Sequence, residues 1–160
     1  MYARHHEELF RYAARYTGDA DLAEDIVQEA FVRLADHPPD AAEAVRPWLF
    51  RAATTIAIDA HRTSRRHLVL AERSPDRLPM AEPALDPARA AEQADLRGKV
   101  RAALDQLEAR DRAILLMREE GFAHHEIADA VGTTTKSVGT MIARALDKLA
   151  RHLDLDAGDV

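Results

Sequence analysis

The sequence predicts an all-α fold in which two small helical modules are joined by a Pro-rich linker, with a helix-turn-helix in the C-terminal module. The composition favours helix, because alanine and leucine abound while only 5% of the 160 residues are aromatic and only six are glycine. Apolar residues recur three or four positions apart along most of the chain, which is the spacing of amphipathic helices. Four of the seven prolines fall within "SPDRLPMAEPALDP", where their regular spacing excludes a stable helix. We therefore divide the chain into an N-terminal module at 1–73, a flexible linker at 74–94, a C-terminal module at 95–155 and a tail at 156–160.

The same composition excludes several classes of protein. The chain has no cysteine, which rules out disulfides, iron–sulfur clusters and thiol nucleophiles. No apolar run approaches the roughly 20 residues of a membrane span, and "MYARHHEELF" lacks the apolar region of a signal peptide. We expect a soluble, cytoplasmic protein with no cofactor, no bound metal ion and no membrane insertion.

Local signals place the helices of the N-terminal module. A first helix ends at Gly18, which stands just beyond its C-terminus, and Asp19 or Asp21 caps the second helix. The two prolines at 38–39 interrupt the chain, and a long helix begins near Arg46. The expected buried faces of the three helices are Leu9, Phe10, Ala13, Ala14 and Tyr16; Leu22, Ile26, Val27, Ala30, Phe31 and Leu34; and Trp48, Leu49, Ala52, Ile56 and Ala60.

The C-terminal module contains the spacing of a helix-turn-helix. This motif needs a small residue where its helices touch, a glycine in the turn and a branched apolar residue that locks the second helix. Ala128, Gly132 and Val138 supply these, and Thr134 can cap the second helix so that its first N–H groups face phosphate. A preceding helix is expected to be capped by Asp111. The second helix is expected to bury Val138, Ile142, Leu146, Leu149 and Leu153.

The opposite face of this second helix makes it a candidate for DNA binding on physical grounds. We expect Thr135, Lys136, Thr140 and Arg144 to read DNA, and Lys148 and Arg151 to contact phosphates. The net charge of −6 opposes DNA binding, but residues 133–153 carry four basic side chains against one acidic side chain. Because the local charge, and not the net charge, decides contact with a polyanion, the helix-turn-helix remains a candidate for DNA binding. The alternative is an ordinary helical hairpin whose basic face is merely solvated.

Two further charged faces could each bind a partner or simply face water. One side of the long helix carries Arg51, Thr55, Asp59, Arg62 and Arg66, with Arg65 beside them. Such a stripe faces either solvent or a phosphate backbone, since so many guanidinium groups are not buried together. The second helix projects Asp25, Gln28 and Glu29 from a segment, 1–45, that holds ten acidic residues and four arginines. An acidic surface of this kind can dock a basic protein, because complementary charge steers the encounter.

These features, in this order, resemble the sigma factors of bacterial RNA polymerase, specifically the small extracytoplasmic-function (ECF) group. Three blocks carry the resemblance over nearly the whole chain: "YTGDADLAEDIVQEAFVRL", "VRPWLFRAATTIAIDAHR" and "LEARDRAILLMREEGFAHHEIADAVGTTTKSVGTMIARALDKL". The resemblance implies a protein that binds core RNA polymerase and directs promoter-specific transcription initiation, with no catalysis of its own. It also implies regulation by an anti-sigma protein, although nothing in this chain identifies that partner.

The resemblance implies a role for each charged face. The family's "AEDIVQEAF" helix binds the clamp helices of the polymerase β′ subunit, which implies docking through Asp25, Gln28 and Glu29. The family's long helix recognises the promoter −10 element, which implies DNA contacts at Arg51, Thr55, Asp59, Arg62, Arg65 and Arg66. Its helix-turn-helix reads the −35 element, which implies contacts at Thr134, Thr135, Lys136, Ser137, Thr140, Arg144, Lys148 and Arg151. The polymerase β subunit is a further expected contact.

Three positions depart from the family pattern. Thr55 stands where the long helix usually carries asparagine, and a hydroxyl lacks the paired donor and acceptor of an amide. Gly139 and Met141 stand on the recognition helix where charged residues are common. A polymerase-binding protein that no longer reads promoters therefore stays an alternative.

Two other classes of protein are alternatives to this interpretation. A helix-turn-helix regulator without polymerase would explain the C-terminal half, but neither the acidic helix nor the arginine stripe. A metal enzyme would have to use His124, His125 and Glu126, or the cluster at 5–8. The spacing differs from the H-E-x-x-H of zinc hydrolases, because Asp129 stands four positions after His125. Adjacent histidines on a helix also point about 100° apart.

Overall fold

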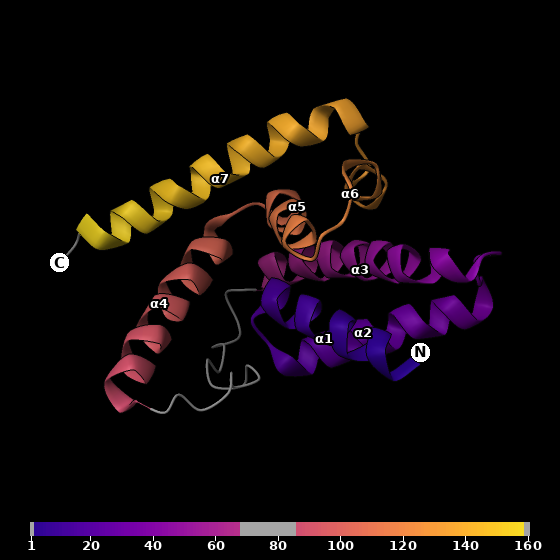
Figure 1. The fold of residues 1–160 in the computed structure, drawn as a ribbon, viewed down its shortest axis with the longest axis horizontal. Helices are drawn as coiled ribbons and strands as arrows, with labels where there is room; N and C mark the ends of the chain where they lie inside the picture. Colours follow the sequence, from indigo (N-terminus) through magenta and orange to yellow (C-terminus); the bar gives the residue numbers. More distant parts are fainter. Residues whose placement is uncertain (1, 68–85, 159–160) are drawn as a thin grey trace.

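The computed structural model describes residues 2–67 and 86–158, and all regular structure within these ranges is helical, which confirms the all-α prediction. The N-terminal module consists of α1 (Tyr2–Thr17), α2 (Ala20–Asp36), the short 3-10 helix η1 (Ala42–Ala44) and α3 (Val45–His67). The C-terminal module consists of α4 (Pro87–Gln106), α5 (Ala109–Glu119), α6 (His124–Val131) and α7 (Thr135–Gly158). In Figure 1, α1, α2 and α3 lie together, α5 and α6 lie next to α3, and α7 crosses the top.

The first chain reversal of the N-terminal module forms where the sequence predicted it. Gly18 has a positive φ of 72°, and its N–H donates to the Ala14 carbonyl oxygen over 2.8 Å, which closes the C-terminus of α1. The Asp19 carboxylate accepts from the N–H groups of Asp21 and Leu22 at 2.9 and 3.2 Å. Of the two predicted caps, Asp19 is therefore the one that α2 uses.

The predicted end of the linker is wrong. Helix α4 begins at Pro87, inside the range 74–94 that we expected to be flexible. The cause is local, because the Asp86 carboxylate accepts from the Ala88 N–H at 3.1 Å and a proline is tolerated in the first turn. The rest of the predicted linker, up to residue 85, lies outside the described residues.

Two other helix boundaries also differ from the prediction. Helix α7 continues to Gly158, whereas the module was expected to end at residue 155 and give way to a tail. Helix α5 begins at Ala109 after Glu108, so Asp111 lies in its first turn instead of capping it. An acidic residue in a first turn still complements the positive end of the helix dipole, which explains why the sequence signal pointed there.

Helix α3 is buried on two sides, which the sequence did not indicate. Of its predicted buried face only Leu49 is fully buried, and the other members are half-buried: Trp48, Ala52, Ile56 and Ala60. The deepest residues of the helix are instead Leu49, Phe50, Ala53, Thr54 and Ala57. The reason is that α3 contacts α1 and α2 of its own module and also α5 and α6 of the other.

The predicted buried stripe of α7 is correct except at one position. Val138 and Ile142 are buried and Leu149 and Leu153 are half-buried, but Leu146 is 41% exposed. Helix α7 contacts α4, α5 and α6, and these contacts leave the Leu146 side chain uncovered.

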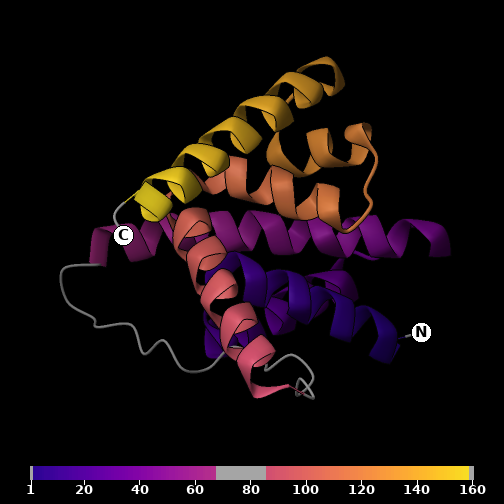
Figure 2. The same cartoon turned by 60° about the vertical axis from the view of Figure 1, so that its left-hand side comes forward.

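The two modules pack directly against each other. Helix α5 contacts α1 and α3, and α6 contacts α3, so that buried side chains from both modules form one continuous core. Figure 2 shows, from a second direction, α5, α6 and α7 stacked on α3 and α4 crossing it. The sequence predicted the two modules but not this arrangement.

Candidate functional site

Helix α2 exposes the polar residues that were predicted to dock a protein partner. Asp25, Gln28 and Glu29 are all exposed, while the opposite side of the helix is buried. The Glu29 carboxylate accepts from the Arg33 side chain at 3.0 Å, so this residue already takes part in an exposed ion pair. Val32 is 55% exposed and lies one turn beyond Gln28 on the same side of the helix. This α2 face therefore offers acidic, amide and apolar groups together.

The predicted basic stripe lies on the exposed side of α3. Four of its members are exposed: Arg51, Thr55, Asp59 and Arg62. The Thr55 hydroxyl donates to the Arg51 carbonyl oxygen at 3.1 Å, so it is engaged with its own helix. Arg65 and Arg66 belong to the last turn of α3, but their side chains lie outside the described part of the structure.

Helices α6 and α7 form a helix-turn-helix with the predicted contacts. Ala128 and Val138 are 2% and 0% exposed, as the motif requires where its helices touch. Gly132 has a φ of 73°, and its N–H donates to the Ala128 carbonyl oxygen at 2.9 Å. From α5, the Arg110 guanidinium donates to the carbonyl oxygens of Val131 and Gly132 at 3.2 and 2.9 Å. The orientation of α7 is thus held by the turn and by α5.

The residues predicted to read DNA lie around the N-terminal half and outer side of α7. Exposed side chains among them are Thr134, Thr135, Lys136, Thr140, Arg144, Lys148 and Arg151, and only Ser137 is half-buried. Thr134 stands immediately before α7, as expected of a cap, and its hydroxyl shares a hydrogen bond of 2.8 Å with the Ser137 hydroxyl. One continuous solvent-facing surface therefore carries hydroxyl and cationic groups.

The cations of α7 differ in their availability to DNA. Lys148 Nζ donates to the Asp111 carboxylate at 2.8 Å, and this hydrogen bond together with the carboxylate charge raises the pKa of Lys148. Arg151 donates to Asp147 at 2.9 Å. Within the described ranges, Lys136 and Arg144 form no ion pair. These two residues are the cations of α7 that a polyanion meets without competition from an acidic neighbour.

Met141 lies off the solvent-facing surface that carries these cations, whereas Gly139 is exposed. Met141 is half-buried and packs against the core, so it does not replace a charged DNA-reading side chain. Gly139 lies where α7 passes α6, and a Cβ atom built there would meet only His124 Cε1, at 3.9 Å. Of the two departures from the family pattern, Met141 therefore leaves the cationic surface of α7 unchanged, and Gly139 leaves a position there without a side chain.

Gly139→Ala is expected to raise the free energy of unfolding by about 0.5–1 kcal/mol. Glycine costs backbone entropy inside a helix, and the added methyl group would stand at an ordinary van der Waals distance from its neighbour. Chemical denaturation of the two proteins measures the difference. A loss of stability would mean that α7 and α6 approach more closely at this point than the geometry indicates.

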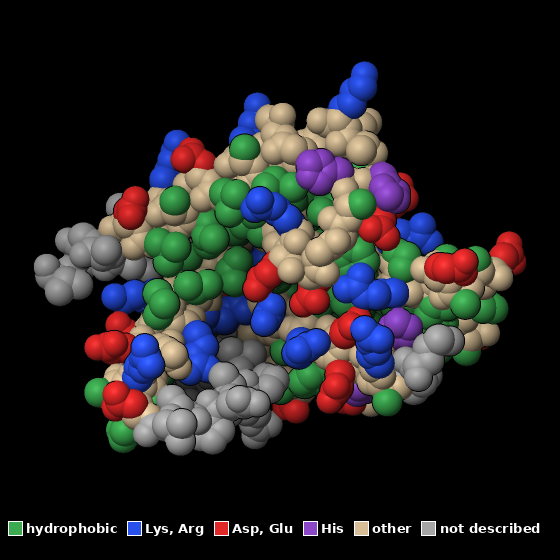
Figure 3. Space-filling view, viewed as in Figure 1, with side chains coloured by type: hydrophobic (Ala, Val, Ile, Leu, Met, Phe, Trp, Pro, Cys, Tyr) green, Lys and Arg blue, Asp and Glu red, His purple; other side chains and the backbone are tan. Residues whose placement is uncertain are grey.

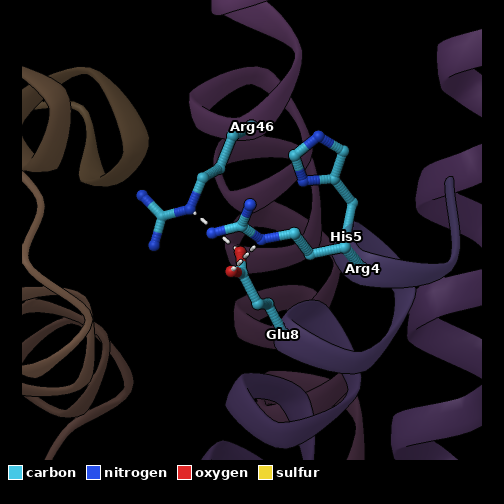
Figure 4. A pocket seen from close by; sticks show the side chains of 4 residues that line it. All are labelled: Arg4, His5, Glu8 and Arg46. Carbon is cyan, nitrogen blue, oxygen red and sulfur yellow. Dashed lines mark hydrogen bonds and ion pairs between the residues drawn. The ribbon is translucent and has the colours of Figure 1, made fainter. Parts of the chain in front are cut away.

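A shallow pocket at the start of α1 and α3 holds internal ion pairs, as Figure 4 shows. The Glu8 carboxylate accepts from Arg46 Nε at 3.0 Å and lies 3.7 Å from Arg4 Nε, with His5 beside it. Over the described ranges, no three His, Asp or Glu side chains gather in a way that could hold a metal ion. No helix in those same ranges is long and apolar enough to cross a membrane.

Comparison with known proteins places both modules in one family. Residues 1–67 match the family model of sigma-70 region 2, and residues 97–149 match that of sigma-70 region 4. The ECF RNA polymerase sigma factor SigX of Bacillus subtilis (strain 168) is 27% identical over 160 residues, which cover 97% of this chain and 82% of that protein. The chain belongs to the ECF sigma-factor family.

Other ECF sigma factors match parts of their own length. SigL of Mycobacterium tuberculosis (strain H37Rv) is 46% identical over 68 residues, which are 41% of this chain and 38% of that protein. SigE of Mycolicibacterium smegmatis is 30% identical over 158 residues, which are 94% of this chain and 59% of that protein. The chain thus spans well under two thirds of the length of SigL and of SigE.

The fold has a close counterpart among solved structures. The sigma factor RpoE of Bartonella quintana, determined in complex with the anti-sigma factor NepR, superposes with a TM-score of 0.72 at 19% sequence identity. The match covers 96% of this chain and 94% of that chain. It therefore extends over both modules of the ECF sigma factor and not over one alone.

The ECF sigma factor also exposes an apolar surface formed by α4 and α7. Leu96 on α4 is 60% exposed and Leu146 on α7 is 41% exposed, with Val100, Leu149 and Leu153 half-buried. Figure 3 shows hydrophobic side chains gathered between these two helices. Helical spacing predicted the three α7 residues as part of a buried face, but spacing alone does not distinguish a core face from a face that a partner covers. We call these five residues the α4/α7 apolar surface.

Proposed function

We propose that this protein is a sigma factor, which binds core RNA polymerase and directs promoter-specific transcription initiation at −10 and −35 elements. The observation that carries the proposal is the exposure of two DNA-facing surfaces, on α3 within the region 2 match and on α7 within the region 4 match. Each surface belongs to a helix whose other side is buried, so its side chains are presented from a rigid support. The protein performs no catalysis of its own and acts in the cytoplasm, where promoter DNA and polymerase are present.

Core polymerase binds first, in this proposal, at the α2 face. Asp25 and Glu29 provide negative charge and Gln28 provides an amide for a basic helical surface, the clamp helices of the β′ subunit. Complementary charge accelerates and orients such an encounter. Val32 adds exposed apolar area at the same place. Burial of apolar area at the centre of an interface stabilises the complex, which charged groups at the rim do not do alone.

The α4/α7 apolar surface is the proposed contact for the β subunit. Leu96 and Leu146 are exposed large apolar side chains, and apolar side chains grouped on a surface are typical of a site that a partner covers. An apolar surface that two neighbouring helices share suits an amphipathic helix, which lays its apolar side along it. The protein thus has one proposed polymerase contact on each module.

An anti-sigma protein is the proposed regulator of this activity. The support is the fold match to RpoE, which was crystallised with the anti-sigma factor NepR. Because the match covers both modules, this protein offers a regulator the same fold that RpoE has.

Run-off transcription with core polymerase and a library of promoter fragments tests the proposed function. The expected result is a set of transcripts that appear only when this protein is added and that share two sequence elements upstream of their start. A direct measurement of binding to core polymerase accompanies it. If neither a promoter-specific transcript nor core binding is found, the sigma-factor function is wrong. Core binding without transcripts would instead support a polymerase-binding protein that no longer reads promoters.

Lys136→Ala and Arg144→Ala are each expected to weaken binding of holoenzyme to the −35 element by about 1–3 kcal/mol. Neither side chain is engaged by an acidic residue in the described structure, so each is available to a base edge or phosphate. Lys148→Ala is the matched control, because Lys148 already pairs with Asp111 and a smaller loss is expected. Footprinting on a fragment that carries only the −35 element measures all three. Equal losses for Lys136 and Lys148 would show that the pairing with Asp111 does not limit the contact.

A further inference from the structure

The DNA-facing side of α7 lacks a side chain at one exposed position, Gly139. This position lies one turn beyond Thr135 and Lys136 and directly before Thr140, and all three of these residues are exposed and proposed to read DNA. Arg144 follows further along the same surface. A glycine supplies no donor and no charge from a side chain. The surface that is proposed to meet DNA therefore has an empty position between its two cations, Lys136 and Arg144.

A side chain from the neighbouring helix lies beside this empty position. Helices α6 and α7 are in contact, and Figure 1 shows α6 next to the beginning of α7. A Cβ atom built on Gly139 would lie 3.9 Å from His124 Cε1. In the described ranges, and apart from the two chain neighbours of Gly139, no other side chain comes within 4 Å of that point. His124 is exposed, so its imidazole stands where a longer side chain on residue 139 would extend.

The His124 imidazole has no polar partner among the residues that the structure describes. The acidic residue that follows it most closely on α6 is Glu126, whose carboxylate accepts from the Ala123 N–H at 2.9 Å. This carboxylate is therefore engaged with the backbone at the start of its own helix. An imidazole carries at least one N–H donor, whether it is neutral or charged. The donor of His124 is thus available to an acceptor outside the protein.

The geometry of a helix-turn-helix indicates which acceptor this is. When the second helix lies in the major groove, the first helix crosses the DNA backbone. His124 is the first residue of α6, the first helix of the motif. The N-terminus of a helix favours a phosphate, because its first N–H groups lack partners within the helix. The group that His124 meets beside the DNA-facing side of α7 is therefore a backbone phosphate.

We propose that His124 compensates for the missing side chain of Gly139: its imidazole N–H donates to a backbone phosphate beside the −35 element, so that α6 and α7 bind this element together. The inference rests on the proposed function, because it names a further contact to the same DNA. The contact contributes affinity and fixes the position of the motif on the duplex, but it does not select a base sequence.

A glycine in this position can also serve a different purpose. Without a Cβ atom, the backbone of α7 could itself approach DNA closely. In that case Gly139→Ala would obstruct the approach and weaken binding. If His124 makes the contact instead, the added methyl group stands at an ordinary van der Waals distance from the imidazole and leaves the contact in place. The two explanations therefore predict opposite results for the same substitution.

Titration of holoenzyme on a fragment that carries only the −35 element separates them. His124→Ala is expected to weaken binding about tenfold, and His124→Gln only about twofold because its amide keeps a donor. Gly139→Ala is expected to change the affinity by less than about twofold. His125→Ala is the matched control, because His125 is also exposed and adjacent helical residues point about 100° apart. Unchanged affinity for His124→Ala, an equal loss for His125→Ala, or a tenfold loss for Gly139→Ala would each overturn the proposal.

Two further measurements test the nature and place of the contact. Because a phosphate contact weakens binding equally for all sequences, His124→Ala should lower the affinity for a −35 fragment and for its base-substituted versions by the same factor. Unequal factors would overturn the assignment to phosphate. Gly139→Lys added to His124→Ala returns a donor to the same place from α7, and it is expected to recover at least about threefold in affinity. No recovery would overturn the compensation.

The outcome for the wild-type protein separates this proposal from the proposed function. Wild-type holoenzyme that neither binds the −35 fragment nor produces promoter-specific transcripts would overturn the proposed function. Normal transcription and binding by wild type, with the same affinity for His124→Ala, would overturn the His124 contact alone.

Discussion

Arg112→Ala is expected to lower the free energy of unfolding by about 3–5 kcal/mol. The Arg112 side chain is 2% exposed, and its guanidinium donates to the carbonyl oxygens of Tyr16, Asp105 and Leu107 at 2.9, 3.2 and 3.2 Å. It also lies 5.2 Å from the centre of the Tyr16 ring. Alanine would leave these carbonyl groups without that donor, and it would open a cavity beneath α1.

Guanidinium chloride denaturation of Arg112→Ala and Arg110→Ala measures this effect against a neighbouring arginine. Arg110 also donates to two carbonyl oxygens, but it is exposed, so water can take its place and a loss of about 1 kcal/mol is expected. Arg112→Lys should fall between the two, because an ammonium group keeps the charge but cannot span three carbonyl groups. If Arg112→Ala and Arg110→Ala were equally stable, the buried network would not contribute what its geometry indicates.

The elements that the sequence predicted well are those determined by neighbours along the chain. Gly18 and Gly132 adopt the left-handed conformation at the ends of their helices, and Asp19 caps α2, because each feature depends on residues within one turn. The helix-turn-helix is predictable for the same reason, since its contacts join Ala128, Gly132 and Val138. The exposure of the proposed docking and DNA-reading residues follows from the same helical spacing.

What the sequence did not predict depends on residues far apart in the chain. Arg112 donates a hydrogen bond to the Tyr16 carbonyl oxygen, and the Phe122 ring packs against the Phe50 ring. A local sequence pattern does not predict such contacts between residues far apart in the chain. The burial of Arg112 could have been predicted from its position alone, because it lies one turn before Leu115 and Leu116 on the buried side of α5. An arginine on an apolar face must find acceptors, and the ends of α1 and α4 supply them.

Two errors at surfaces have a common cause. The buried side of α3 is broader than predicted because a second module covers it, and Leu146 is exposed although α7 contacts α4, α5 and α6. Amphipathic spacing reports that a face is apolar but not what covers it, whether a neighbouring helix, another module or a separate protein. The α4/α7 apolar surface can therefore be recognised as exposed only from the positions of the helices in the structure.

Reversing two charges on α2, Asp25→Lys with Glu29→Lys, is expected to weaken binding to core polymerase about a hundredfold, or about 2.7 kcal/mol. Both side chains are exposed, and their partner is expected to be basic, so the change replaces attraction with repulsion on both sides. The fold should be unaffected, because Glu29 loses only an exposed ion pair to Arg33. Circular dichroism checks helicity, and fluorescence anisotropy with labelled protein measures the affinity for core.

The control for this variant is Asp40→Lys with Glu43→Lys, which changes the net charge of the same module by the same amount. Both residues are exposed and lie outside α2, so a general charge effect would weaken core binding equally in the two variants. A loss confined to the α2 variant, and reduced at high salt, is the expected result, since screening weakens exposed charge pairs. Unchanged affinity in the α2 variant would mean that polymerase docks elsewhere. The α4/α7 apolar surface would then be the first place to test, through Leu146→Ser, because it is the other proposed contact with core.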